Sequence, residues 1–186
     1  MTDTLAAFFL VFLAELGDKS MVLAVALAAR YRPAPVLGGI AIAAALMLGV
    51  AALLGAAAGA TLPATPLALA GGTLFLLFGV WTLNATEDEE GPADLKGPSV
   101  LLGVTAAFLI AEFGDKTMLA TAALASTQSP PLTWVGASAG MTAASGLAIG
   151  LTRVLGARLS PGLVQRAAAA GFLLFGILLI ADGVRG

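Results

Sequence analysis

The chain has 186 residues, of which 59% are hydrophobic and only 11% are charged, and its formal net charge is −2. This composition is typical of a protein that crosses a membrane several times, and it excludes an ordinary soluble domain. Because cysteine and histidine are both absent, disulfide bridges, thiolate metal sites and histidine-based zinc sites are excluded. Any metal ion would have to be bound mainly by oxygen atoms.

Six apolar runs follow one another, each close to the roughly 20 residues that a helix needs to cross a bilayer. They cover residues 5–29, 36–60, 67–83, 100–125, 132–151 and 167–181. Short uncharged turns lie at 61–66 and 126–131, and a polar linker with four consecutive acids at 87–90 follows the third run. No Lys or Arg precedes the first run, which is atypical of a signal peptide, so we interpret that run as a retained span.

The first and fourth runs each contain three charged residues at matching places. The first has Glu-Leu-Gly-Asp-Lys-Ser at residues 15–20, and the fourth has Glu-Phe-Gly-Asp-Lys-Thr at residues 112–117. Ionisable groups at membrane depth are costly and usually mark a path for ions or protons. Because positions i, i+3 and i+4 share one face of a helix, we expect the acids and the lysine of each motif to point the same way.

The two halves of the chain align without a gap at an offset of 97 residues, from Glu15 to Glu112. Outside the motifs the offset also matches prolines, glycines and a Phe-Leu-Leu-Phe-Gly segment. The matches are Pro33 with Pro130, Gly39 with Gly136, Gly49 with Gly146, Gly59 with Gly156, and residues 75–79 with 172–176. These residue types are not common enough here to match by chance, so the alignment indicates an internal duplication.

A duplicated unit of three spans enters the membrane with opposite orientations, as in the inverted repeats of secondary transporters. We therefore predict an all-α membrane protein of six transmembrane helices, arranged as two inverted-topology three-helix repeats. The repeats would cover residues 1–86 and 99–186 and be joined by an acidic cytoplasmic linker at 87–98.

The basic residues predict the orientation, because cytoplasmic loops are enriched in Lys and Arg. Only Arg185 falls on the side of the two termini, which we therefore place outside. The residues on the other, cytoplasmic side are Arg30, Arg32, Lys96, Arg153, Arg158 and Arg166.

The two motifs together supply a candidate site for a cation. The candidate metal ligands are Glu15, Asp18, Glu112 and Asp115. These four carboxylates and the two motif lysines carry a net charge of −2, which one divalent cation would neutralise. Without the cation, burial and mutual repulsion favour uptake of protons by the same groups. Oxygen ligands suit Ca²⁺, Mn²⁺ or Mg²⁺ better than Zn²⁺ or Cu²⁺.

The other motif residues have predicted supporting roles. The glycines allow close helix approach or local unwinding, the lysines orient and tune the carboxylates, and the hydroxyls add polar groups. These residues are Gly17, Lys19, Ser20, Gly114, Lys116 and Thr117. Met21 and Met118 offer a soft thioether that would favour Mn²⁺, although methionine on a membrane helix usually serves packing. The competing interpretation, that the charges are only buried salt bridges, is disfavoured because such pairs stabilise poorly and the acids outnumber the bases.

Two copies of the pattern E-x-G-D-[KR]-[ST], one opening each half of a six-span chain, resemble the small Ca²⁺/Mn²⁺–proton exchanger family. That family has eukaryotic Golgi members and bacterial manganese exporters and is grouped with the lysine-exporter superfamily. The resemblance covers essentially the whole chain. It implies that Glu15, Asp18, Glu112 and Asp115 bind the transported cation and that Mn²⁺ or Ca²⁺ leaves the cytoplasm in exchange for protons.

The sequence thus predicts a divalent-cation/proton antiporter of the inner (plasma) membrane, with the cation, protons and the lipid bilayer as its partners. It indicates no enzyme, prosthetic group or nucleic-acid partner, and a homodimer is compatible with it. Two alternatives stay open, namely an exporter of a small amino-acid-like solute and an uncoupled cation channel.

Overall fold

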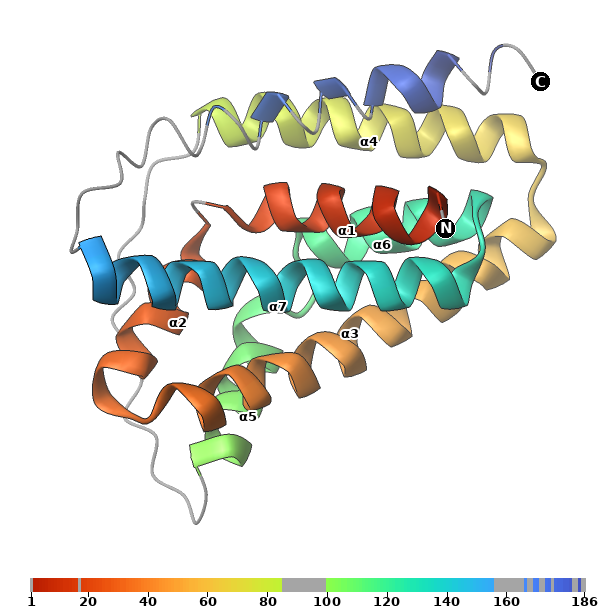
Figure 1. The fold of residues 1–186 in the computed structure, drawn as a ribbon. Helices are drawn as coiled ribbons and strands as arrows, with labels where there is room; N and C mark the ends of the chain where they lie inside the picture. The colour runs from red at the N-terminus through yellow and green to blue at the C-terminus, as the bar shows by residue number, and fades with distance from the viewer. Residues whose placement is uncertain are drawn as a thin grey trace.

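The computed structural model consists of α-helices, and no strand occurs among the residues that it describes (Figure 1). Those residues are 2–16, 18–84 and 100–155, together with 166, 169–170, 173–174, 176–181 and 184. In chain order the helices are α1 (Thr2–Glu15), α2 (Lys19–Arg30), α3 (Pro33–Thr61), α4 (Ala64–Asn84), α5 (Val100–Glu112), α6 (Lys116–Thr127) and α7 (Pro130–Leu155). The predicted all-α class is confirmed for this part of the chain.

The two predicted spans that contain the motifs are each broken into two helices. α1 and α5 end at the glutamates of the motifs, and α2 and α6 begin at the lysines. Figure 1 shows that the two helices of each pair point in different directions. The expectation of continuous helices over residues 5–29 and 100–125 is therefore wrong. The expectation that the charged residues of one motif share a helical face is wrong for the same reason.

The break in the second motif has a stereochemical cause at Gly114. Its φ is +80°, a region that residues with a Cβ rarely adopt. Gly114 stands two residues after the end of α5, where helices commonly end with a left-handed glycine. Asp115 then takes an extended conformation, with φ −72° and ψ 172°, directly before α6. The glycine ends one helix and lets the next begin in a new direction.

A Cβ added at Gly114 would meet no atom within 4 Å, so Gly114→Ala isolates the cost of the backbone conformation. We expect the free energy of unfolding to fall by about 1–2 kcal/mol, the usual penalty for a left-handed residue with a Cβ. The midpoint of thermal unfolding in detergent should fall with it. Gly150→Ala in α7 is the matched control, because space is open there too and alanine favours the helix. Equal midpoints for the two variants would show that Gly114 is not under this constraint.

α3 and α7 are the longest helices described. Over Pro33–Thr61 and Pro130–Leu151 they are long and apolar enough to cross a membrane, and no other described helix meets both conditions. α3 packs against α5 and α6, whereas α7 packs against α1 and α2. Each long helix therefore lies against the broken pair from the other half of the sequence. The predicted span 67–83 lies within α4, and most of the predicted span 167–181 falls outside the described residues.

Small residues bring these helices into close contact at corresponding positions of the two halves. A Cβ added at Gly39 would lie 2.8 Å from the carbonyl oxygen of Leu101, and one at Gly136 would lie 2.2 Å from that of Thr4. The 97-residue offset relates Gly39 to Gly136 and Thr4 to Leu101, so these two contacts occupy equivalent positions. The relation recurs in a second pair of contacts, Gly49 with Trp134 and Gly146 with Leu37. The two halves thus contact each other in matched register.

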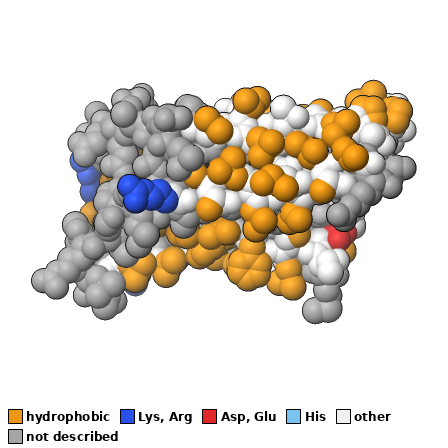
Figure 2. All heavy atoms as spheres, turned by 90° about the horizontal axis from the view of Figure 1, so that it is seen from above, with side chains coloured by type: hydrophobic (Ala, Val, Ile, Leu, Met, Phe, Trp, Pro, Cys, Tyr) orange, Lys and Arg blue, Asp and Glu red, His pale blue; other side chains and the backbone are white. Residues whose placement is uncertain are grey.

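Large apolar side chains are exposed over much of the surface. Ile110 is 82% exposed, and Leu53 and Phe113 are each 72% exposed. In Figure 2 hydrophobic side chains cover the middle of the visible face, with Lys and Arg atoms towards one end and Asp or Glu atoms towards the other. Trp134 is also exposed, and its indole N–H donates to the Ala45 carbonyl at 2.9 Å. An apolar belt between polar ends is the surface that a lipid bilayer requires.

The start of α1 is tied to the turn between α6 and α7. The Asp3 carboxylate accepts a hydrogen bond from the Ser129 backbone N–H at 3.1 Å. The exposed Arg30 and Arg32, by contrast, flank the turn between α2 and α3. Figure 1 shows this turn and the N-terminus at opposite ends of the molecule.

Candidate functional site

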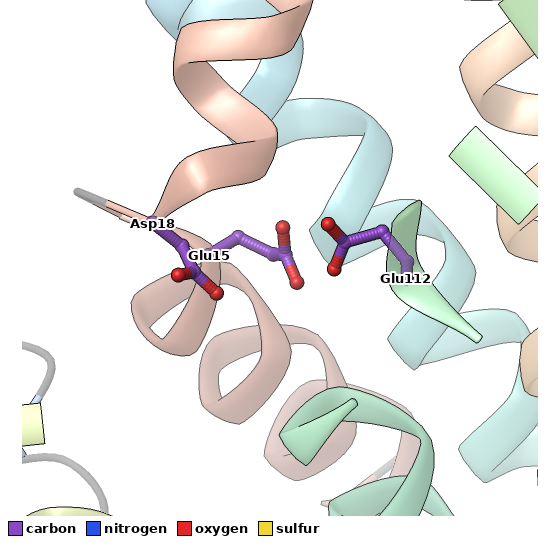
Figure 3. Close-up of side chains that lie close together, drawn as sticks. All are labelled: Glu15, Asp18 and Glu112. Atoms are coloured by element: carbon purple, nitrogen blue, oxygen red, sulfur yellow. The ribbon is translucent and has the colours of Figure 1, made fainter. Parts of the chain in front are cut away.

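Three acids from the two motifs come together where the helices break. Each of Glu15, Asp18 and Glu112 offers a carboxylate oxygen, and these atoms all lie within 4.8 Å of one another. Figure 3 shows the Glu15 and Glu112 side chains pointing towards each other, with Asp18 beside Glu15. The residues come from the end of α1, from the α1–α2 break and from the end of α5. The cluster therefore exists only because the two halves pack together.

The two glutamates of the cluster are fully buried, with 0% of each exposed. Neither oxygen of Glu112 has a hydrogen-bond partner in the described part of the chain, and Oε1 of Glu15 also has none. Oε2 of Glu15 accepts a hydrogen bond from the Ser20 hydroxyl. A buried ionised carboxylate without a partner is strongly unfavourable. The pair is therefore suited to bind a cation or protons.

A lysine of the second motif forms an ion pair with an acid of the first. Lys116 Nζ lies 2.7 Å from Asp18 Oδ2, and the two side chains are 7% and 19% exposed. Lys116 is the first residue of α6, so the pair joins the start of that helix to the α1–α2 break. Lys19 corresponds to Lys116 in the first motif, and its side chain lies outside what the structure describes.

The backbone around the cluster has the same local form in both motifs. The Asp18 N–H donates to the Glu15 carbonyl at 3.2 Å, and the Asp115 N–H donates to the Glu112 carbonyl at 3.1 Å. The clustered glutamates are also the last residues of α1 and α5. The C-terminal end of a helix carries partial negative charge. Both helix ends therefore add to the attraction of the carboxylates for a cation.

The fourth predicted ligand, Asp115, is not one of the three acids that approach so closely. It is half-buried in the α5–α6 break, and its Oδ2 has no hydrogen-bond partner among the described residues. Thr117, two residues further along the chain, is buried, and its hydroxyl also has no hydrogen-bond partner among the described residues. Glu15, Asp18 and Glu112 thus form the closest group of acids, and the role of Asp115 as a fourth ligand stays a prediction.

The predicted soft ligand Met118 has a contact of its own. Its sulfur accepts a hydrogen bond from the Gly114 N–H at 3.2 Å, so it supports the glycine turn. Met21 is half-buried on α2, and Gly17 falls outside the described residues.

Sequence reasoning missed two features of this site. The motif order of glycine, then aspartate, then lysine contains a helix stop followed by a helix start, and this signal could have predicted the break. The pairing of Lys116 with Asp18 had no such signal, because it depends on how the two halves pack.

Comparison with known proteins identifies the family. A profile of the divalent cation/proton antiporter GDT1 family matches residues 3–90 and 100–186. A Vibrio cholerae protein named "Putative manganese exporter" is 33% identical over 90% of this chain and 84% of its own length. A GDT1-like protein of Synechocystis is 30% identical over 96% of both chains.

Protein PAM71 of the Arabidopsis thaliana chloroplast is 30% identical over 95% of this chain, which spans only 56% of that longer protein. No solved structure is significantly similar to the chain. The resemblance expected from the doubled motif is confirmed, and with it membrane transport of a cation as the general activity of the family. The chain belongs to the divalent cation/proton antiporter GDT1 family.

Proposed function

We propose that this protein exports Mn²⁺ or Ca²⁺ from the cytoplasm in exchange for protons, with one central site built from both motifs. The observation that carries the proposal is the meeting of Glu15, Asp18 and Glu112 within 4.8 Å. Oxygen ligands of this kind suit hard divalent cations. Asp115 is half-buried in the second break and its side chain interacts with that of Glu112, so it would complete the ligand set.

Protons and the metal ion would compete for the same oxygens. The Glu112 carboxylate is fully buried with neither oxygen hydrogen-bonded in the described structure, so it needs a bound cation or a proton to offset the cost of burial. A cation leaving the cluster would be replaced by protons, and protons leaving would be replaced by the cation. This exclusive occupancy is the physical basis of exchange.

The proposed architecture is two inverted three-helix repeats, residues 1–86 and 99–186, joined by the linker at 87–98. It is supported by the matched contacts of Gly39 and Gly136 and by the packing of each long helix on the broken pair of the other half. Movement of one repeat against the other would expose the carboxylates to each side of the membrane in turn.

The proposed location is the inner membrane of a bacterium, with both termini outside. Arg30 and Arg32 are exposed at the end of the molecule away from the N-terminus (Figure 1). The positive-inside rule assigns that end to the cytoplasm.

The test is transport by the purified protein reconstituted into vesicles that contain a metal indicator and a pH indicator. We expect external Mn²⁺ or Ca²⁺ to enter while the lumen becomes alkaline, because protons leave in exchange. Metal entry without a pH change would indicate an uncoupled channel. A pH change driven by lysine, and block of metal entry by lysine, would indicate an exporter of amino-acid-like solutes.

A further inference from the structure

Two buried threonines outside the motifs continue from the acid cluster towards the N-terminal end of the molecule. Thr121 lies one turn after Thr117, the last residue of the second motif, and both are 0% exposed. Thr133, in the first turn of α7, is also 0% exposed, and its N–H donates to the Ser129 carbonyl at 2.9 Å. Because Ser129 contacts Asp3 at the start of α1, Thr133 lies near that end.

The two threonines of α6 lie on the side of that helix that is left for α1 and α7. Ala122 and Ser126 lie against glycines of α3, and Ala123 lies against a glycine of α4. Thr117 and Thr121 are four residues apart and share a different face of α6. Since α6 also packs against α1 and α7, and the three helices run side by side (Figure 1), the hydroxyls lie between these helices.

Two of the three hydroxyls have no hydrogen-bond partner. Threonine in a helix commonly donates to the carbonyl four residues earlier, as Thr121 does to Thr117 at 2.7 Å. The hydroxyls of Thr117 and Thr133 have no partner among the described residues. A buried hydroxyl left unpaired costs about 1–3 kcal/mol, and valine, with nearly the same shape, would pack without that cost. The hydroxyls are therefore poorly explained by packing, whereas a passing cation or water molecule would pair with them.

The equivalent positions of the first half are apolar. The 97-residue offset relates Thr121 to Ala24 and Thr133 to Val36, and both of these residues are also 0% exposed. Positions of equal burial thus carry hydroxyls towards the N-terminal end and only methyl groups towards the α2–α3 turn. The matched packing of the two halves therefore does not require the hydroxyls.

We propose that Thr121 and Thr133 line the route by which the cation and protons pass between the acid cluster and the N-terminal end. This inference rests on the function proposed above. A hydroxyl both donates and accepts hydrogen bonds, so it replaces water around a partly dehydrated cation and holds the water that carries protons. Because both side chains are fully buried, the route is closed in this structure, and movement of the repeats opens it.

The test compares Thr133→Val with Thr133→Ser in Mn²⁺ uptake by reconstituted vesicles and in thermal unfolding. Valine removes the hydroxyl, so we expect uptake to fall about tenfold, the rate equivalent of one lost hydrogen bond. Its Tm should equal or exceed that of the wild type, because an unpaired buried hydroxyl is gone. Serine keeps the hydroxyl and should keep the wild-type uptake, although the lost methyl group lowers the Tm. Equilibrium binding of radioactive Mn²⁺ should be unchanged in both variants, since Thr133 lies outside the acid cluster.

Thiols at matched positions provide a second measurement, because the chain has no cysteine. Thr133→Cys and Val36→Cys are each treated, during transport, with a small charged methanethiosulfonate reagent on both sides of the membrane. We expect the reagent to modify Thr133→Cys and stop its transport, because water reaches this position when the route opens. Val36→Cys, equally buried in the structure, should stay unmodified.

The outcomes separate the two proposals. Wild-type protein that does not transport Mn²⁺ would overturn the proposed function and this inference together. If the wild type transports Mn²⁺, wild-type uptake in Thr133→Val would overturn only the route. A joint fall of uptake and Tm in Thr133→Val, or equal modification of the two cysteine variants, would indicate a structural role and would also overturn it.

Discussion

Replacing Glu15 or Glu112 with glutamine is expected to reduce proton-coupled Mn²⁺ transport at least about 100-fold, which corresponds to about 2.8 kcal/mol. Each substitution removes one of the two fully buried carboxylates that face each other across the halves (Figure 3). Glutamine has nearly the same shape, and in Glu112→Gln it also removes a buried charge that has no hydrogen-bond partner in the described structure. The variants should therefore accumulate in the membrane as folded protein.

The measurement is Mn²⁺ uptake into vesicles containing equal amounts of each variant, with folding checked by size-exclusion chromatography. Asp3→Asn is the matched control, because it makes the same charge change at the N-terminal end of α1, beside Ser129, and outside the acid cluster. It should transport normally. Wild-type transport rates in both glutamine variants would show that Glu15 and Glu112 have no role in transport.

The second large effect is expected at glycines where the two halves touch. A Cβ at Gly55 would lie 2.1 Å from the carbonyl oxygen of Ala122, and one at Gly136 would lie 2.2 Å from that of Thr4. Because the obstructing atoms belong to the backbone, Gly55→Ala and Gly136→Ala must push whole helices apart. We expect each substitution to lower the free energy of unfolding by about 1–3 kcal/mol and the Tm by about 2–12 °C.

Gly146→Ala controls for the change from glycine to alanine within a helix. The nearest atom to a Cβ there is a side-chain carbon of Leu37 at 3.6 Å, which is an ordinary contact, so this variant should unfold at or above the wild-type temperature. Thermal unfolding of the detergent-solubilised proteins compares the three variants. A Tm for Gly55→Ala equal to that of Gly146→Ala would mean that α3 and α6 are not packed as closely as the structure has them.

Much of the architecture could be predicted because it depends on local sequence. Apolar length predicts the helices that became α3 and α7, and proline near the start of each marks where they begin. The duplication predicts that corresponding residues of the two halves meet, and the cluster of Glu15 and Glu112 has that geometry. Their role as ligands of a metal remains a prediction.

The helix breaks were not predicted, because hydropathy measures the length of an apolar run and does not report a change of direction within it. Gly114 at φ +80° turns the chain without altering the hydropathy of the run. The ion pair of Lys116 with Asp18 could not be predicted either, since each lysine also has an aspartate next to it in its own motif.

The most direct test is an anomalous-scattering map from crystals of the wild-type protein grown with Mn²⁺. A shared site predicts a single strong peak between the carboxylates of Glu15 and Glu112, bonded to oxygens from both motifs, and no such peak in Glu112→Gln. A peak bound by only one motif, or located away from both glutamates, would contradict the proposal that the two halves hold one cation between them.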